Sequence, residues 1–403
     1  MTEAETHRRK YLRDPAPTRG VALCLSGGGY RAALFHLGVL RRLNELGTLG
    51  HVDTISGVSG GSILAGFLAQ HVERWPEPGE RVDGFESLAG KFRDFTKKNV
   101  RTLWILRRPG NSAAAVESLQ RHYEKDIIQL PLGGLPDRPE YVFAATDLSF
   151  GVNWTFRRGK AGSYEAGYLD PADWPAAKAV AASSCFPPAF EPMPLKLAPD
   201  DLVGGKATKG PRRDELIRDL RLSDGGVYDN MALEAVWKNH SVVLVSDGGA
   251  VFNRTAPHGL ISQIGRYLAI QGDQAGDMRK RWLMAQFHSK AENHLRGVYF
   301  GIGSTATHFS DDAEGYGEAA VDVIARIRTD LDYFTDAEAG VLQNHGYLLA
   351  EAAMREHGSD WVAADARRAR TPFDQWAPGR PLDALRNSHK RRALGRWRLL
   401  SRE

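Results

Sequence analysis

The sequence SGVSGGS around Ser59 constrains the fold of this chain more than any other stretch. It places Ser59 at the centre of a G-x-S-x-G pattern, after the apolar-leaning run 51–55 and before the helix-like run 62–70. A strand followed by a sharp turn and a helix lifts the side chain at the apex clear of the sheet. Gly57 and Gly61 lack the side chains that would collide in such a turn. The segment therefore predicts a nucleophilic serine at the end of a strand.

The residues before this turn show the same order of elements. Val21–Leu25 is a continuous apolar run, as expected of a strand buried on both faces. A glycine-rich stretch follows, and then a run over 31–46 whose leucines recur near helical spacing. The run 241–245, SVVLV, predicts a further buried strand. This β-α-β-α order predicts an α/β fold with a central, mostly parallel sheet and helices on both faces.

The pattern along the chain indicates one large domain with two flanking segments. We expect a flexible N-terminal arm at 1–18, the domain at 19–355 and a basic C-terminal tail at 356–403. Within the domain, 71–135 is expected to be a helical insertion and 251–355 a helical C-terminal part. No repeat or linker interrupts the domain.

Composition narrows the class of protein. The chain is 42% hydrophobic and 25% charged, which is ordinary for a globular protein, and a net charge of +4 gives no argument for nucleic-acid binding. Cys24 and Cys185 lie in apolar surroundings and predict buried thiols, with no spacing that suggests a metal site. The polar start lacks a secretory signal, and no run approaches the ~18 apolar residues that span a bilayer. We expect a cytoplasmic protein.

A reactive serine needs a base and donors for the oxyanion that forms when a carbonyl is attacked. The N–H of Gly60 opens the helix after the serine. The loop Gly27, Gly28 and Gly29 ends the first strand and can approach a ligand closely. We therefore expect these four glycines to form an oxyanion hole, in which each donor typically lowers the barrier by about 3 kcal/mol.

The glycine loop also allows a different interpretation. From Gly27 to Ala32 it fits G-x-G-x-x-G/A, the fingerprint of dinucleotide-binding folds. That fingerprint requires an acidic residue at the end of the second strand, about 20 residues further on. Asp53 lies near that distance, but at the start of the predicted strand. A dinucleotide-binding enzyme is therefore the weaker alternative.

The base is not an obvious histidine. His36 lies within the first helix, where a packed core residue is the simpler interpretation. Two Ser-Asp-Gly-Gly sequences instead place Asp224 and Asp247 where strands end. Because Asp-Gly-Gly is commonly only a turn, the residues alone leave open which aspartate serves the serine.

Four motifs, in this order over roughly 19–250, resemble those of the patatin-like phospholipase family. SGGGYRAALFHLGVL is similar to its glycine-rich oxyanion loop and GVSGGS to its nucleophile elbow. AASSCFPPAFEP is similar to its block beside the active site, and SDGGVYDN to its Asp-Gly-Gly/Ala motif with a downstream asparagine. The resemblance implies a three-layer α/β fold and a Ser–Asp dyad that uses no histidine and no cofactor.

Carried onto this chain, the resemblance implies that Ser59 is the nucleophile and Asp224 the base, because only Asp224 is followed by the family's asparagine. It also implies supporting roles for Arg31, which would steady the oxyanion loop, and for Gly57, Gly61, Pro187, Gly225, Gly226 and Asn230. Ala32 and Ala232 stand where the family often has glycine and proline, which affects loop detail more than chemistry.

The implied activity is hydrolysis of acyl esters in a phospholipid or lysophospholipid, with an inactive lipid-binding or scaffolding protein as the alternative. Peripheral contact with a membrane would fit two basic segments, VRTLWILRR at 100–108 and the C-terminal tail. A buried helix with solvated arginines and a solvated tail explain the same segments, and we favour these simpler interpretations.

Overall fold

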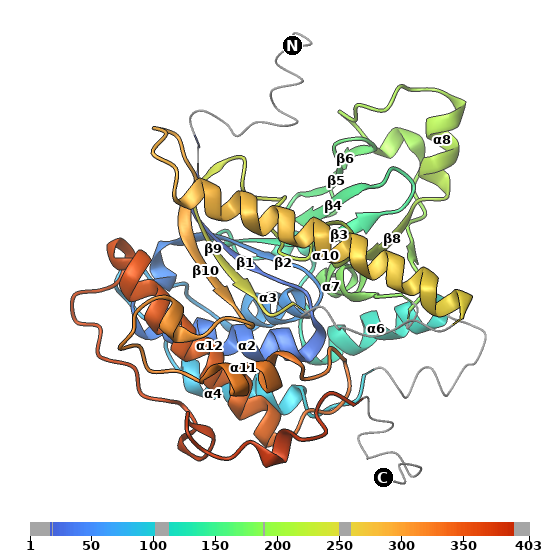
Figure 1. The fold of residues 1–403 in the computed structure, drawn as a ribbon. Coiled ribbons are helices and arrows are strands. Elements are labelled where there is room, and N and C mark those ends of the chain that lie inside the picture. Colours follow the sequence, from blue (N-terminus) through green and yellow to red (C-terminus); the bar gives the residue numbers. More distant parts are fainter. Residues whose placement is uncertain (1–16, 18, 101–112, 188–189, 250–258, 391–403) are drawn as a thin grey trace.

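The computed structural model describes residues 17, 19–100, 113–187, 190–249 and 259–390. Residues 101–108, which make up all but the first residue of VRTLWILRR, and most of the N-terminal arm lie outside the described ranges, so the predictions for them are not addressed by the structure. Within the described ranges, ten strands form one sheet in the order β10-β9-β1-β2-β3-β4-β5-β6, with β8 and β7 joined to β3 (Figure 1).

The parallel part of the sheet consists of five strands. They are β1 (Arg19–Leu25), β2 (Val52–Gly57), β3 (Glu140–Asp147), β9 (His240–Asp247) and β10 (Arg296–Gly301). Their carboxyl ends lie along one edge of the sheet, which is where α/β proteins place their ligands. The prediction of a central, mostly parallel sheet is therefore confirmed.

The remaining strands are antiparallel. They are β4 (Val152–Arg157), β5 (Lys160–Ser163), β6 (Gly167–Leu169), β7 (Met193–Pro194) and β8 (Arg221–Asp224). Strand β8 pairs with the end of β3, on the same side of β3 as β2. This pairing brings the end of β8 close to the end of β2, where Ser59 follows.

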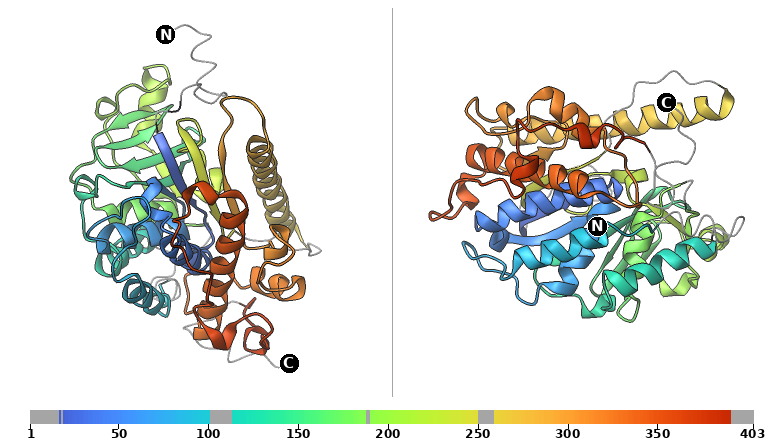
Figure 2. Two further views of the ribbon diagram at one scale, coloured as in Figure 1. Left: turned by 90° about the vertical axis from the view of Figure 1, so that its left-hand side faces the viewer. Right: turned by 90° about the horizontal axis from the view of Figure 1, so that it is seen from below.

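Helices cover both faces of this sheet (Figures 1 and 2). Alternate residues of β1 point to opposite faces, so that Leu23 and Leu25 belong to one core and Ala22 and Cys24 to another. The first core is formed with α2 (Gly29–Glu45), α3 (Gly60–His71), α4 (Phe85–Phe95), α6 (Ala113–Asp126), α7 (Ala176–Ser184) and α12 (Asp336–His357). The second core packs residues 231–236 and the end of α10 (Leu260–Phe287) against the other face.

Three short helices complete the set of described α-helices: α8 (Pro211–Arg218), α9 (Gly226–Asp229) and α11 (Glu318–Ala325). Cys24 and Cys185 are buried free thiols, as expected. None of the helices in the described ranges is both long and apolar enough to cross a membrane.

The C-terminal third differs from the expectation in two places. The part at 251–355 is not wholly helical, because it contains the edge strand β10 beside β9. The expected tail begins as part of the domain, since Trp361 and Leu385 are buried and the N–H of Arg328 donates to the carbonyl oxygen of Ser388 at 2.9 Å. We therefore propose a domain that extends to about residue 390.

Candidate active site

Ser59 occupies the turn between β2 and α3 in a backbone conformation that residues other than glycine rarely adopt. Its φ is +51°, and Ala232 is the other non-glycine residue with positive φ in the described chain. Such a conformation costs roughly 1–3 kcal/mol and persists only where the surroundings fix it. The N–H of Ser59 donates to Ser183 Oγ at 3.0 Å, and the side chain is largely buried. The turn thus has the geometry expected of a nucleophile elbow.

Gly57 and Gly61 explain why this turn can be so tight. A side chain on Gly61 would collide with the carbonyl oxygen of Leu25 at the end of β1. A Cβ on Gly57 would lie 2.8 Å from the backbone nitrogen of Ser62. Both positions therefore require glycine for close approach of backbone, whatever chemistry the serine performs.

The pairing of β3 brings Asp224 to this turn. Phe143 of β3 pairs with Gly57 at the end of β2, and two residues later Ala145 pairs with Asp224 at the end of β8. Strand β4 lies on the opposite side of β3, so β2 and β8 share one side of it and end facing each other. The residue that ends β8 therefore lies beside the serine that follows β2.

The Asp224 carboxylate is buried and only partly satisfied. Its Oδ1 accepts a hydrogen bond from the N–H of Gly226 at 2.8 Å, while Oδ2 has no partner of normal geometry among the described residues. Burial raises the pKa of Asp224 to about 7, opposed by the Gly226 N–H and the Ser59 hydroxyl. The hydroxyl is close enough to favour the charged carboxylate without forming a bond of standard length and angle. Catalytic hydrogen bonds are often this loose before substrate binds.

Ser183, at the end of α7, connects the two halves of the site. Its hydroxyl donates to the carbonyl oxygen of Ala144 at 2.6 Å and accepts from Ser59 N–H. Its carbonyl oxygen accepts from the N–H of Gly225 at 3.2 Å. Ser183 was not among the predicted site residues, although it lies in the AASSCFPPAFEP motif. Pro187 of the same motif is exposed in the turn that follows.

The predicted oxyanion hole is only partly available. The N–H of Gly27 donates to the carbonyl oxygen of Asn230 at 3.0 Å, so the expectation that Gly27 serves an oxyanion does not fit this structure. The N–H groups of Gly28, Gly29 and Gly60 have no acceptor among the residues described. Gly28 and Gly29 have φ values of +139° and +59°, which turn the loop back toward the serine helix. A side chain on Gly60 would collide with the Gly29 carbonyl oxygen, so the two candidate donor groups are adjacent.

Asn230 joins the glycine loop to the aspartate motif. Its carbonyl oxygen holds Gly27, and its side-chain Oδ1 lies 2.6 Å from where a Cβ on Gly226 would stand. Gly225 and Gly226 are accordingly packed against the site, Gly225 beneath the carbonyl of Ala144.

Arg31 was expected to steady the glycine loop, but its side chain binds the backbone of other segments. Its guanidinium is buried and donates to the carbonyl oxygen of Gly248 at 2.8 Å and to those of Ala325 and Ile327 at 3.1 and 3.0 Å. It makes no hydrogen bond to the glycine loop itself. The loop is supported through Gly248, whose carbonyl oxygen lies 2.9 Å from where a Cβ on Gly28 would stand.

The second Asp-Gly-Gly sequence forms a turn at the end of β9. Asp247 Oδ1 accepts from the N–H of Gly249 at 2.9 Å, and Oδ2 accepts from the Tyr299 hydroxyl at 2.7 Å. Both carboxylate oxygens therefore have donors, in contrast to Asp224. No interaction joins Asp247 to Ser59.

None of the histidines in the described chain forms a hydrogen bond to the serine hydroxyl. His36 is buried between Ser246 Oγ at 2.6 Å and the carbonyl oxygen of Ser26 at 3.0 Å, and burial lowers its pKa to about 4. It is a core residue, as predicted. Asp53 accepts from the N–H of Val21 at 3.0 Å, at the amino edge of the sheet. This places it at the wrong edge for a ribose partner of the glycine loop and argues against the dinucleotide interpretation.

Comparison with known proteins agrees with the motifs. The family model "Patatin-like phospholipase" matches residues 23–237. A protein of Saccharomyces cerevisiae named "Putative meiotic phospholipase SPO1" is 40% identical over 77 residues, which cover 18% of this chain and 12% of that protein.

Solved structures show weaker likeness. Human GIVD cytosolic phospholipase A2 has a TM-score of 0.47 at 12% identity. The superposition covers 93% of this chain and 63% of the human chain. VipD from Legionella pneumophila has a TM-score of 0.36 at 14% identity, and that superposition covers 84% of this chain and 67% of the VipD chain. The chain spans about an eighth of the yeast relative and under two thirds of the human enzyme. Since the family model covers more than half of the chain and includes the serine turn, the glycine loop and the aspartate motif, this protein belongs to the patatin-like phospholipase family.

Proposed function

We propose that the protein is a lipid acyl hydrolase that cleaves the carboxylic esters of phospholipids or lysophospholipids through a Ser59–Asp224 dyad. One observation carries the proposal. The strained Ser59 lies beside a buried aspartate whose pKa is raised to about 7, and three glycine N–H groups without acceptors among the described residues lie next to it. A base with a pKa near neutrality suits proton transfer at physiological pH.

In the first step, Asp224 Oδ2 takes the proton of the Ser59 hydroxyl as Oγ bonds to the acyl carbonyl carbon. The electron pair of the carbonyl moves to its oxygen, and the resulting oxyanion accepts hydrogen bonds from Gly28, Gly29 and Gly60. Collapse of this intermediate breaks the ester C–O bond. The leaving alcohol takes the proton back from Asp224, which leaves an acyl-enzyme on Ser59.

In the second step, water replaces the alcohol. Asp224 removes a proton from the water as its oxygen attacks the acyl carbonyl, and the same N–H groups hold the second oxyanion. Collapse releases the fatty acid and returns the proton to Ser59. No other group has to change its charge, since Asp224 alternates between carboxylate and carboxylic acid.

The surface around this edge of the sheet supports action at a lipid surface. Exposed apolar side chains there follow elements that end beside Ser59: Leu148 after β3, Phe186 after α7 and Val227 after Asp224. Helix α10 has 28 residues, about 42 Å, whereas β9 beside it has 8, about 26 Å. Because Leu283 and Phe287 pack its end against the sheet, its first half runs beyond the carboxyl edge (Figure 2).

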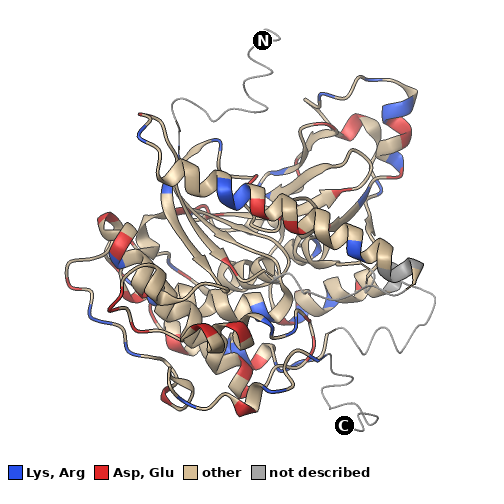
Figure 3. Cartoon of the chain, in the orientation of Figure 1, with Lys and Arg blue, Asp and Glu red and all other residues tan. Residues whose placement is uncertain are grey.

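The exposed half of α10 has the character of an interfacial helix. Ile264, Tyr267 and Leu268 are 49%, 63% and 64% exposed and lie at helical spacing on one side. The charged residues of this helix are concentrated in its second half (Figure 3). We propose that this half of α10 and the apolar residues at the rim contact the lipid surface from which Ser59 takes its substrate.

Hydrolysis of a lipid panel tests the proposed function. Phosphatidylcholine, lysophosphatidylcholine and a triacylglycerol are offered to wild type, Ser59→Ala, Asp224→Asn and the matched control Asp247→Asn, with fatty-acid release as the readout. We expect release from at least one phospholipid by wild type and Asp247→Asn only. Absence of release from every lipid by folded wild type would favour the inactive lipid-binding alternative.

A further inference from the structure

A pocket lies at the opposite end of α2 from the glycine loop. It has a volume of about 660 Å³ and is lined by α2, by Arg81 and Glu86, by Tyr347 of α12 and by the segment 365–372. Arg41, on its wall, follows Gly29 by 12 residues, which places it about 18 Å along the helix. The pocket is therefore separate from the proposed reaction site.

The lining of this pocket carries an excess of positive charge. Six arginines face three carboxylates: Arg41, Arg42, Arg81, Arg367, Arg368 and Arg370 against Glu45, Glu86 and Asp365. The negative end of the α2 macrodipole amounts to about half a charge and leaves most of the excess uncompensated. An excess of positive charge around one cavity favours an anion in it.

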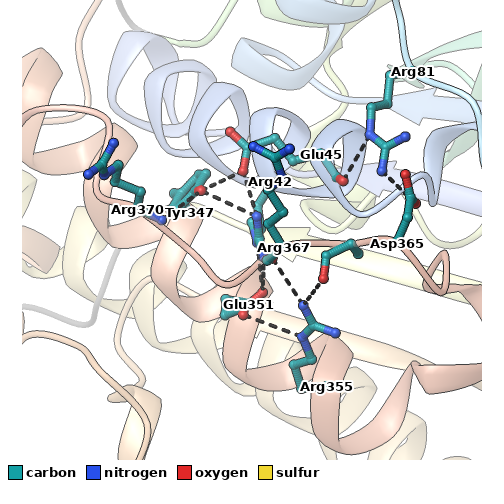
Figure 4. A network of polar contacts seen from close by, with 10 residues as sticks. Arg42, Glu45, Arg81, Tyr347, Glu351, Arg355, Asp365, Arg367 and Arg370 are labelled. Atoms are coloured by element: carbon teal, nitrogen blue, oxygen red, sulfur yellow. Dashed lines mark hydrogen bonds and ion pairs between the residues drawn. The ribbon is translucent and has the colours of Figure 1, made fainter.

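The inner wall of the pocket is held rigidly by a buried network (Figure 4). Arg42 is 1% exposed and binds Glu45 at 2.5 Å and Glu351 at 2.6 Å. The same guanidinium donates to the carbonyl oxygen of Arg367 at 2.5 Å. The N–H of Arg370 donates to the Tyr347 hydroxyl at 3.1 Å. The backbone that bears the outer arginines is thus fixed in place before any ligand arrives.

The guanidinium of Arg81 donates to described residues from all three of its nitrogens, but the other four arginines of the pocket offer donors that the described residues do not use. Arg41 is 5% exposed, and its Nη2 donates to Glu86 at 2.8 Å, but its buried Nε and Nη1 have no acceptor in the described chain. Arg367, Arg368 and Arg370 are exposed, and no described carboxylate lies within ion-pair distance of them. A buried guanidinium with two unused donors is costly unless something accepts from them.

We propose that this pocket binds a phosphate ester that carries more than one negative charge. The planar guanidinium fork matches phosphate oxygens, and several forks around one cavity favour a ligand with several such oxygens. The volume lies in the range of sites for whole small molecules and exceeds the size of one phosphate ion. The ligand is either a soluble phosphate ester or the headgroup of a lipid at a membrane surface.

Titration calorimetry with pyrophosphate tests the site on the full chain, and sedimentation with vesicles distinguishes the source of the ligand. The variants are Arg368→Gln/Arg370→Gln and Arg41→Gln, with Arg212→Gln as a surface control that lies on α8 outside the pocket and is 78% exposed. Vesicles of neutral phosphatidylcholine are compared with vesicles that contain phosphatidate. Thermal unfolding verifies that each variant is folded, which matters most for the buried Arg41.

We expect wild type and Arg212→Gln to bind pyrophosphate, and the double variant to bind at least tenfold more weakly while hydrolysis of a soluble ester is unchanged. Preference for phosphatidate vesicles that depends on Arg368 and Arg370 would assign the site to a lipid headgroup. Pyrophosphate binding without that preference would assign it to a soluble ester. Absence of binding to both probes, or an equal loss in Arg212→Gln, would overturn the proposal.

Discussion

The hydroxyl of Ser183 accepts a hydrogen bond from the backbone N–H of Ser59 at 3.0 Å, although 124 residues separate them. The carbonyl oxygen of Ser183 holds Gly225, the neighbour of Asp224, at 3.2 Å. One buried serine thus sets the positions of both members of the proposed dyad relative to each other. Misplacement of reacting groups by about 1 Å can reduce a rate a hundredfold, so we expect the loss of this contact to slow catalysis.

Removing this hydroxyl is the first prediction. Ser183→Ala removes the hydroxyl that donates to the Ala144 carbonyl oxygen, and it leaves the Ser59 N–H with only its bond to the Ser183 carbonyl oxygen at 3.2 Å. We expect this loss to cost about 1–3 kcal/mol of stability. We expect kcat for a soluble ester to fall about 10- to 100-fold, with KM little changed. The control is Ser241→Ala, whose hydroxyl donates to Gly20 at the other edge of the sheet. An unaltered kcat in Ser183→Ala would show that the contact is only structural.

The dependence of the rate on pH follows from the raised pKa of Asp224. Asp224 must be ionised to take the proton of Ser59, and burial raises its pKa to about 7. We expect kcat/KM to rise about tenfold per pH unit below 7 and to level off above about pH 8. An aspartate with its ordinary pKa would instead give a constant rate from pH 5 upward, and that profile would exclude Asp224 as a buried base.

As the pH rises, the free energy of unfolding should fall while the activity rises. Because the folded-state pKa of Asp224 lies above its unfolded value, folding is not penalised below pH 4, and stability is lost as the pH rises through 7. Asp224→Asn removes the ionisation. We expect it to be more stable than wild type by about 1–3 kcal/mol at pH 8 and equal to it at pH 4, measured by urea unfolding. Lower stability of Asp224→Asn at pH 8 would contradict the desolvated carboxylate.

Contact with lipid should depend on the exposed half of α10. Leu268→Glu places a charge among exposed apolar residues, and we expect binding to phosphatidylcholine vesicles to weaken about tenfold or more. Hydrolysis of a soluble ester should not change, because the residue lies outside the catalytic groups. Val203→Glu is the matched control, since Val203 is 67% exposed on another part of the surface. Equal losses in both variants would point to a general effect of charge.

Much of the site could be predicted from the sequence because its parts are local. The turn at Ser59 needs two glycines within five residues, and the loop before α2 needs small residues that accept positive φ. Such local requirements can be recognised directly in the amino-acid sequence. The choice of Asp224 over Asp247 was not available from these patterns and came from the resemblance. The structure distinguishes them by the unpartnered Oδ2 of Asp224 and the two donors on Asp247.

Contacts between distant parts of the chain could not be predicted. The use of the Gly27 N–H by Asn230 depends on how two loops meet, and no local pattern encodes it. Arg31 reaches Gly248 and Ile327, which belong to segments far along the chain. The short strand β10 was missed because RGVYFG has a glycine within it and little apolar alternation. Its pairing with β9, a long-range interaction, decides its structure.

The most direct test of the central claim is the rate at which a fluorophosphonate probe labels Ser59, followed by intact-protein mass spectrometry. We expect one added probe in wild type and Asp247→Asn at equal rates, none in Ser59→Ala, and labelling of Asp224→Asn slowed by at least a hundredfold. Because the probe requires no lipid surface, this rate reports only the activation of the serine. Labelling of Asp224→Asn at the wild-type rate would contradict the proposed dyad.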